Sequence, residues 1–226
     1  MRSMDEFKAA PSPRPTINKS ISLQDEIANS ISHGLALLLA LAMVPVLVLS
    51  AVRIGNIHFA IGASVFGGTV VLLYFASTLY HSLTHEGAKH FFRLFDHSSI
   101  FLLIAGTYTP FALGVLRGRW GWTLLIVVWV LAVIGIVTKA VLGLRHSWIS
   151  MTLYLLMGWL AVVAVKPIFL LVPLPGILLI LAGGLAYTGG LAFLAARQMR
   201  YGHFIWHLFV IAGTTCHFFA VLWYAA

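Results

Sequence analysis

Residues 121–143 read GWTLLIVVWVLAVIGIVTKAVLG, an apolar run in which Lys139 is the only charged residue. A helix needs about 20 apolar residues to cross the hydrocarbon core of a bilayer, so this run predicts a membrane-spanning helix. The strands of a membrane barrel would alternate apolar and polar residues, and this run does not. Similar runs recur along the chain and predict seven spans in all, at residues 29–51, 59–82, 97–116, 121–143, 148–165, 172–195 and 203–224.

The composition supports an all-α integral membrane protein. Of the 226 residues, 61% are hydrophobic and 9% are charged, which is too little charge for the surface of a soluble domain of this length. The net charge of +8 does not indicate nucleic-acid binding, because the basic residues lie between apolar runs, where they anchor helices. The single cysteine, Cys216, excludes a disulfide or a cysteine-based metal site within one chain.

The chain divides into a short tail and one membrane domain. Residues 1–20 are basic and proline-rich without an apolar core, so we expect a mobile cytoplasmic tail rather than a signal peptide. Residues 21–226 are predicted to form a seven-helix membrane domain whose fifth span ends at Lys166–Pro167. We expect this multi-pass domain in the cell's inner (plasma) membrane.

The basic residues also predict the orientation of the domain. Positive charge concentrates on the cytoplasmic side of membrane proteins, and this distribution favours a cytoplasmic N-terminus and a C-terminus outside. The inside set is Arg2, Lys8, Arg14, Lys19, Lys89, Arg93, Lys139, Arg145, Arg197 and Arg200, and the outside set is Arg53, Arg117, Arg119 and Lys166.

Three histidines predict a metal site at one end of the bundle. His203 and His207 lie one turn apart at the start of the last span, so their side chains project from the same helix face. His81 ends the second span, and the alternation of spans places it at the same, cytoplasmic, depth. Three histidine ligands with an open fourth position are typical of a catalytic zinc ion. Asp96 begins the third span at this depth, where its carboxylate can touch water at the metal or orient a ligand histidine.

Further polar residues occur at helical spacing from these histidines or on a polar face of the first span. Because polar side chains within a membrane must face protein or water, we expect them near the metal site. An intramembrane histidine can instead bridge two helices by a hydrogen bond, and a proton relay would use the same residues. The candidates are Ser77, Glu26, His33, His97 and His217.

Three motifs occur in order along the chain. They read EIANSISH at 26–33, STLYH at 77–81 together with FDHSSIFLLIAGTYTPF at 95–111, and HFIWH at 203–207 followed by Gly213 and His217–Phe218. These motifs resemble those of the hemolysin III proteins, the bacterial branch of the progestin and adipoQ receptor family. The resemblance covers about residues 20–226.

The resemblance implies a seven-helix protein with a cytoplasmic N-terminus and a zinc ion near the cytoplasmic side. The family's three ligands correspond to His81, His203 and His207, and the aspartate linked to the zinc through water corresponds to Asp96, with Ser77 as a further polar neighbour. Receptor relatives are thought to hydrolyse the amide bond of ceramide-like lipids. Bacterial members carry the label hemolysin, and roles in membrane-lipid homeostasis have been proposed for them.

We therefore expect a zinc-dependent intramembrane hydrolase, ceramidase-like, with a membrane lipid as its substrate or ligand and Asp96 and Ser77 as its catalytic residues. A pore-forming hemolysin acting by cytolysis is one alternative, which the stable polytopic bundle argues against. A sensor or receptor of membrane state with a non-catalytic zinc is another. A transporter is a further alternative, although no inverted repeat points to a transport site.

Overall fold

Every element in the described part of the chain is helical. The computed structural model describes residues 22–144, 146–196 and 198–226, so the predicted tail, 1–20, lies outside the described residues. No strand occurs within these ranges, which confirms the all-α prediction. The elements are α1 (Leu23–Arg53), α2 (Ile57–Ser82), α3 (Glu86–Leu113), α4 (Arg119–Leu142), α5 (Ser147–Gly158), the 3₁₀ helix η1 (Leu160–Ala164), α6 (Val165–Leu171), α7 (Leu174–Ala195) and α8 (Gly202–Tyr224).

Six helical segments of the described residues are long and apolar enough to cross a membrane. They are α1, α2, α4, the continuous stretch Ser147–Leu171 that contains α5, η1 and α6, and then α7 and α8. Most of the third predicted span, 97–116, falls in α3, which ends at Leu113, is 28 residues long and is not one of these six. The helix starts at Glu86 instead of 97, and its first turns carry Lys89, Arg93 and Asp96, which lower its hydropathy.

Helix α1 begins at a reciprocal cap. The hydroxyl oxygen of Ser22 accepts a hydrogen bond from the backbone N–H of Asp25 at 3.2 Å, and the Asp25 carboxylate accepts one from the N–H of Ser22 at 3.3 Å. These two bonds satisfy backbone groups that the first helical turn leaves without partners. The cap fixes the start of α1 at Leu23, three residues before Glu26.

The stretch Ser147–Leu171 is broken near its middle, and the predicted end at Lys166–Pro167 is wrong. Pro167 lies in the first turn of α6, where a proline is tolerated because its missing N–H has no helical partner to lose. Ahead of it, the hydroxyl of Tyr108 accepts the N–H of Ala161 at 3.0 Å and lies 2.9 and 2.8 Å from the carbonyls of Met157 and Gly158. A side chain of α3 thus satisfies the backbone groups that the break exposes.

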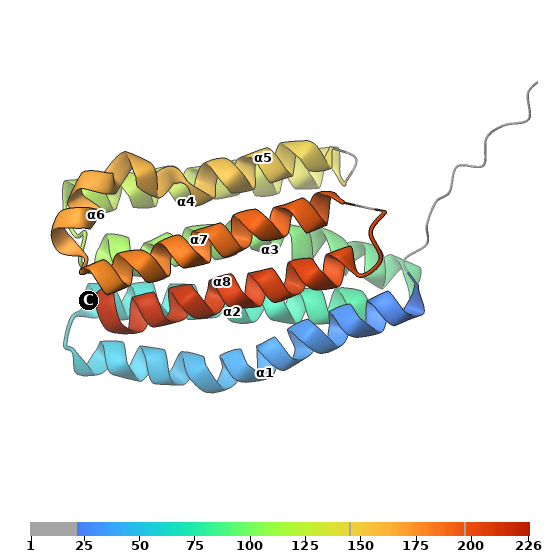
Figure 1. Ribbon diagram of the computed structural model, residues 1–226, viewed down its shortest axis with the longest axis horizontal. Helices are drawn as coiled ribbons and strands as arrows, with labels where there is room; N and C mark the ends of the chain where they lie inside the picture. Colours follow the sequence, from blue (N-terminus) through green and yellow to red (C-terminus); the bar gives the residue numbers. More distant parts are fainter. Residues whose placement is uncertain (1–21, 145, 197) are drawn as a thin grey trace, which may run out of the picture.

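The helices run roughly alongside one another in a single bundle (Figure 1). Helix α2 packs between α1 and α3, α3 also packs on α4, and α8 packs on α7 and α1. The starts of α1 and α8 and the α4–α5 connection lie at one end of the bundle, and the C-terminus lies at the other (Figure 1). Because α2 ends where α3 begins, side chains of four helices meet at the first of these ends.

Close helix contact depends on glycines, and Gly62 is the strictest case. A Cβ atom at Gly62 would lie 2.6 Å from the backbone Cα of Pro110 on α3, a contact that side-chain movement cannot relieve. We expect Gly62→Ala to destabilise the protein by about 1–3 kcal/mol or more, because an overpacked core must shift its backbone. Thermal unfolding in detergent measures this loss. Gly68→Ala on the same helix is the matched control, since nothing lies within 4 Å of its Cβ; equal melting temperatures for the two variants would contradict the prediction.

Candidate metal centre

The structure brings the three predicted histidines together from two helices. His81 lies in the last turn of α2, and His203 and His207 lie in the first two turns of α8. Each offers one ring nitrogen, and these three atoms all lie within 4.8 Å of one another. His81 and His207 are buried, with 4% and 1% of their surfaces exposed. Three imidazoles at this separation could hold one metal ion.

The His81 ring is oriented by a carboxylate from α1. Its Nδ1 atom donates to Oε2 of Glu26 at 2.6 Å, and Oε1 of the same carboxylate accepts from the ammonium of Lys89 at 2.9 Å. A histidine that donates through Nδ1 leaves Nε2 as a lone-pair donor. Nε2 of His81 is buried and has no hydrogen-bond partner among the described residues. The ring is therefore prepared to bind a cation through Nε2.

The His207 ring is oriented in the same way by the backbone of α1. Its Nδ1 lies 3.2 Å from the carbonyl oxygen of Asn29 and 3.0 Å from the hydroxyl of Ser32, which itself donates to that carbonyl at 2.8 Å. Nδ1–H is the tautomer that satisfies this carbonyl, and it leaves Nε2 free as a ligand. The His33 ring stacks on His207 with centroids 3.6 Å apart and planes 7° apart, which restricts ring rotation.

A small cavity connects this cluster to Asp96. His203, His207, His33, Asp96 and His97 all line it. The Asp96 carboxylate is buried, and its Oδ2 lies 3.4 Å from Nδ1 of His97. Buried Nε2 of His203 has no hydrogen-bond partner within the described part of the chain. The unpaired histidine nitrogens together form a donor set that fits a metal ion, and a carboxylate faces the same space.

Two other predicted residues occupy different positions. Ser77 is fully buried one turn before His81, and its hydroxyl has no hydrogen-bond partner among the residues described, but it does not line the small cavity. His217 is not part of the cluster. Its Nε2 donates to the carbonyl of Ile180 on α7 at 3.1 Å, because the ten residues that separate it from His207 carry it about 15 Å further along α8.

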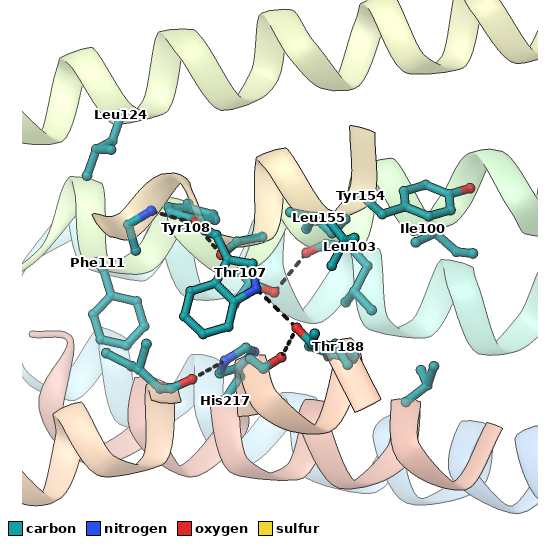
Figure 2. Close-up of a pocket in the computed structure, with 18 of the residues that line it drawn as sticks. Ile100, Leu103, Thr107, Tyr108, Phe111, Leu124, Tyr154, Leu155, Thr188 and His217 are labelled. Atoms are coloured by element: carbon teal, nitrogen blue, oxygen red, sulfur yellow. Dashed lines mark hydrogen bonds between the residues drawn. The ribbon is translucent and has the colours of Figure 1, made fainter. Parts of the chain in front are cut away.

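A larger cavity, which His217 helps to line, was not predicted from the sequence. It has a volume of about 120 Å³ and lies among α2, α3, α4, α5, η1, α6, α7 and α8, and Figure 2 shows its wall, mostly of apolar side chains such as Leu103, Leu124 and Phe111. Its polar exceptions include Tyr108, which holds the break in Ser147–Leu171. Four residues line both the large and the small cavity: Leu73, Ile100, Trp206 and Val210. The histidine cluster and Asp96 therefore adjoin one end of an apolar chamber.

Several contacts at the centre have no signal in the sequence. Lys89 reaches Glu26 from α3, and Ser32 and Asn29 reach His207 from α1, across sequence separations of 63, 175 and 178 residues. Helical spacing predicts which residues share a face but not which helix that face meets. Only the packing of α1 between α2 and α8 supplies these partners.

Comparison with known proteins identifies relatives over almost the whole chain. Residues 21–218 match the family model described as haemolysin-III related. The chain is 42% identical over 203 residues to the hemolysin-3 homolog of Bacillus subtilis (strain 168), covering 90% of this chain and 95% of that protein. It is also 42% identical over 202 residues to hemolysin-3 of Bacillus cereus, covering 89% and 92%.

A more distant relative links the chain to the wider progestin and adipoQ receptor family. The human monocyte to macrophage differentiation factor is 25% identical over 171 residues, which cover 71% of this chain and 69% of that protein. The match to the family model extends over nearly the whole helical bundle and includes all three clustered histidines. The chain therefore belongs to the haemolysin III family.

Proposed function

We propose that this protein is a zinc-dependent hydrolase that cleaves an amide or ester bond of a membrane lipid. The observation that carries the proposal is the adjacency of three histidines, two of them with oriented rings, to a buried carboxylate and a large apolar chamber. Imidazole nitrogens are ligands that zinc accepts well, and the set leaves a position open for a substrate. An apolar chamber beside such a site suits an acyl chain.

The proposed arrangement has seven spans in the inner (plasma) membrane, with the N-terminus on the cytoplasmic side. Helix α3 is the span to be added to the six apolar ones. Its 28 residues pack between α2 and α4, and its carboxylate Asp96 faces the bundle interior. The lysines and arginines favour the end with the histidines as the cytoplasmic one, by ten residues to four. A lipid headgroup near that interface would reach the site while its tail enters the chamber.

Zinc, when bound by His81, His203 and His207, supplies a Lewis acid that polarises a carbonyl and makes water a nucleophile near neutral pH. The protein residues supply the rest. Glu26 and the Asn29 carbonyl fix the orientation of two rings. Asp96 accepts the proton that the attacking water loses and passes it to the leaving amine or alcohol. His33, which lines the small cavity, positions the polar part of the substrate, whereas Ser77 lies outside that cavity.

The test of this function is the release of free fatty acid by the purified protein. Ceramides, other N-acyl lipids and phospholipid esters would be presented in proteoliposomes, and products followed by mass spectrometry. The proposal requires turnover of at least one amide or ester that is abolished by a chelator. A protein that holds zinc but turns over none of them would instead favour a membrane-state sensor or receptor.

The orientation of His81 by Glu26 leads to a prediction about metal affinity. We expect Glu26→Gln to weaken zinc binding about 10–100-fold, because a neutral amide holds the ring less firmly and makes Nε2 less basic. Competition with a chelator of known affinity measures the change. Glu86→Gln, an exposed carboxylate on α3, is the control and should bind zinc as wild type does. Unaltered affinity in Glu26→Gln would assign Glu26 to pairing with Lys89 alone.

The names of the Bacillus relatives support a second candidate, a pore-forming hemolysin. A pore would conduct ions through the bundle independently of the metal. Conductance measured in planar bilayers separates the two functions: currents that persist after chelation favour the pore, and metal-dependent lipid turnover without currents favours the hydrolase.

A further inference from the structure

Lys139 is a buried cation that has no partner among the described residues. It lies in the last turn of α4, on the same face as Gly135, which packs against Phe101 of α3. Only 2% of its surface is exposed, yet it forms no hydrogen bond and no ion pair with any residue of 22–144, 146–196 and 198–226. Buried ammonium groups within membrane proteins are costly unless they are paired.

A second positive charge makes the position of Lys139 less favourable. Arg93, on α3, is close enough for its positive charge to repel that of Lys139, and it too has neither an ion pair nor a hydrogen bond within the described residues. The C-terminal end of a helix favours a cation, but its partial charge of about half an electron offsets only part of one cation. A nearby anion would therefore offset the charge of the buried Lys139.

The composition of the chain restricts where that anion can come from. No acidic residue follows Asp96, so α4, α5, α6, α7 and α8 contain none. Each carboxylate within the described residues is at the surface or held by other partners. The six acidic residues are Asp5 and Glu6, outside the described residues, Asp25 in the α1 cap, Glu26 between His81 and Lys89, the exposed Glu86, and Asp96 beside His97.

We propose that Lys139 and Arg93 form a binding site for a phosphate group, supplied by the headgroup of an anionic membrane lipid. A guanidinium and an ammonium are the two side-chain groups best suited to a phosphodiester, the first through paired N–H donors and the second as a point charge. Both residues lie toward the end of the bundle where the α4–α5 connection and the start of α1 are found (Figure 1). Lipid headgroups surround the ends of a spanning bundle, so both residues lie at headgroup depth. The site does not depend on the proposed hydrolase activity.

The test uses the full-length protein in a neutral detergent. Short-chain phosphatidylglycerol, short-chain phosphatidylcholine and inorganic phosphate are titrated separately, and the rise in melting temperature gives each apparent affinity. Native mass spectrometry counts the retained lipid. We expect phosphatidylglycerol to stabilise the protein more than either of the other two. Lys139→Gln and Arg93→Gln should each weaken its apparent affinity about fivefold, while zinc content stays at the wild-type value.

Lys166→Gln is the matched control, because Lys166 is an exposed lysine in α6 at the opposite end of the bundle. An equal loss of affinity in this variant would overturn the proposal, since it would mean a general effect of charge. Unchanged affinity in Arg93→Gln, a surface substitution that leaves the packing of α4 intact, would also overturn it. If inorganic phosphate stabilised the protein as much as phosphatidylglycerol does, the claim that a lipid supplies the anion would be overturned.

Discussion

Replacing His203 and His207 together by alanine is expected to remove zinc from the protein and to abolish lipid turnover. Two of the three clustered nitrogens are lost, and a single histidine cannot retain the ion against water. Helix α8 keeps other contacts with α7 in this variant, since Gly183 of α7 packs against His217 and Gly190 packs against Trp206 and Phe209. Metal content by mass spectrometry and fatty-acid release measure the two losses.

The control for this variant is His90→Ala combined with His146→Ala. Both of these histidines are exposed and neither belongs to the cluster, so the control should retain metal and activity. A double variant of His203 and His207 that still holds stoichiometric zinc would place the ion elsewhere. Loss of zinc in the control as well would point to adventitious surface binding.

Asp96→Asn is expected to keep the metal and to lose turnover by about 10²–10⁴-fold, the range for removal of a general acid–base group. Asparagine has the shape of aspartate and still fills the space beside His97, but it cannot accept a proton. Asp96 is not in the group of three ligand residues, so metal content should stay at the wild-type value.

Three results separate the roles of Asp96. A zinc content equal to that of the wild type, together with strongly reduced turnover, supports the proton-transfer role. Loss of zinc would make Asp96 a residue that holds the site together, and unchanged turnover would remove it from the chemistry. Glu86→Gln, on the same helix but exposed, controls for a change of one negative charge on α3.

The sequence predicted the helices that are apolar along their whole length, and it missed where the others begin or break. Residues 121–143 match α4 within a few residues, because nothing but apolar side chains decides this element. The start of α3 at Glu86 was missed because its first turns carry charged residues, among them Lys89, which pairs with Glu26 of α1. The break after Gly158 depends on the hydroxyl of Tyr108, which is 50 residues away in the chain.

Helical spacing predicted only those parts of the candidate site that depend on positions within a single helix. The four-residue interval between His203 and His207 and the equal depth of His81 are properties of single helices, and the structure brings these residues together. His217 shares their face of α8 but lies too far along it to join them, so a shared stripe is not sufficient evidence of a shared site. The apolar chamber is absent from any local pattern because residues of eight different elements line it.

The most direct test of the central claim is a metal titration of lipid hydrolysis. The purified protein is stripped with a chelator, reloaded with known amounts of zinc, and assayed for fatty-acid release from lipid amides and esters in proteoliposomes. The account predicts that turnover disappears on stripping and returns in proportion to zinc, reaching its maximum at about one ion per chain. Turnover that is unaffected by stripping, or a fully loaded protein that releases no fatty acid from any of these lipids, would contradict it.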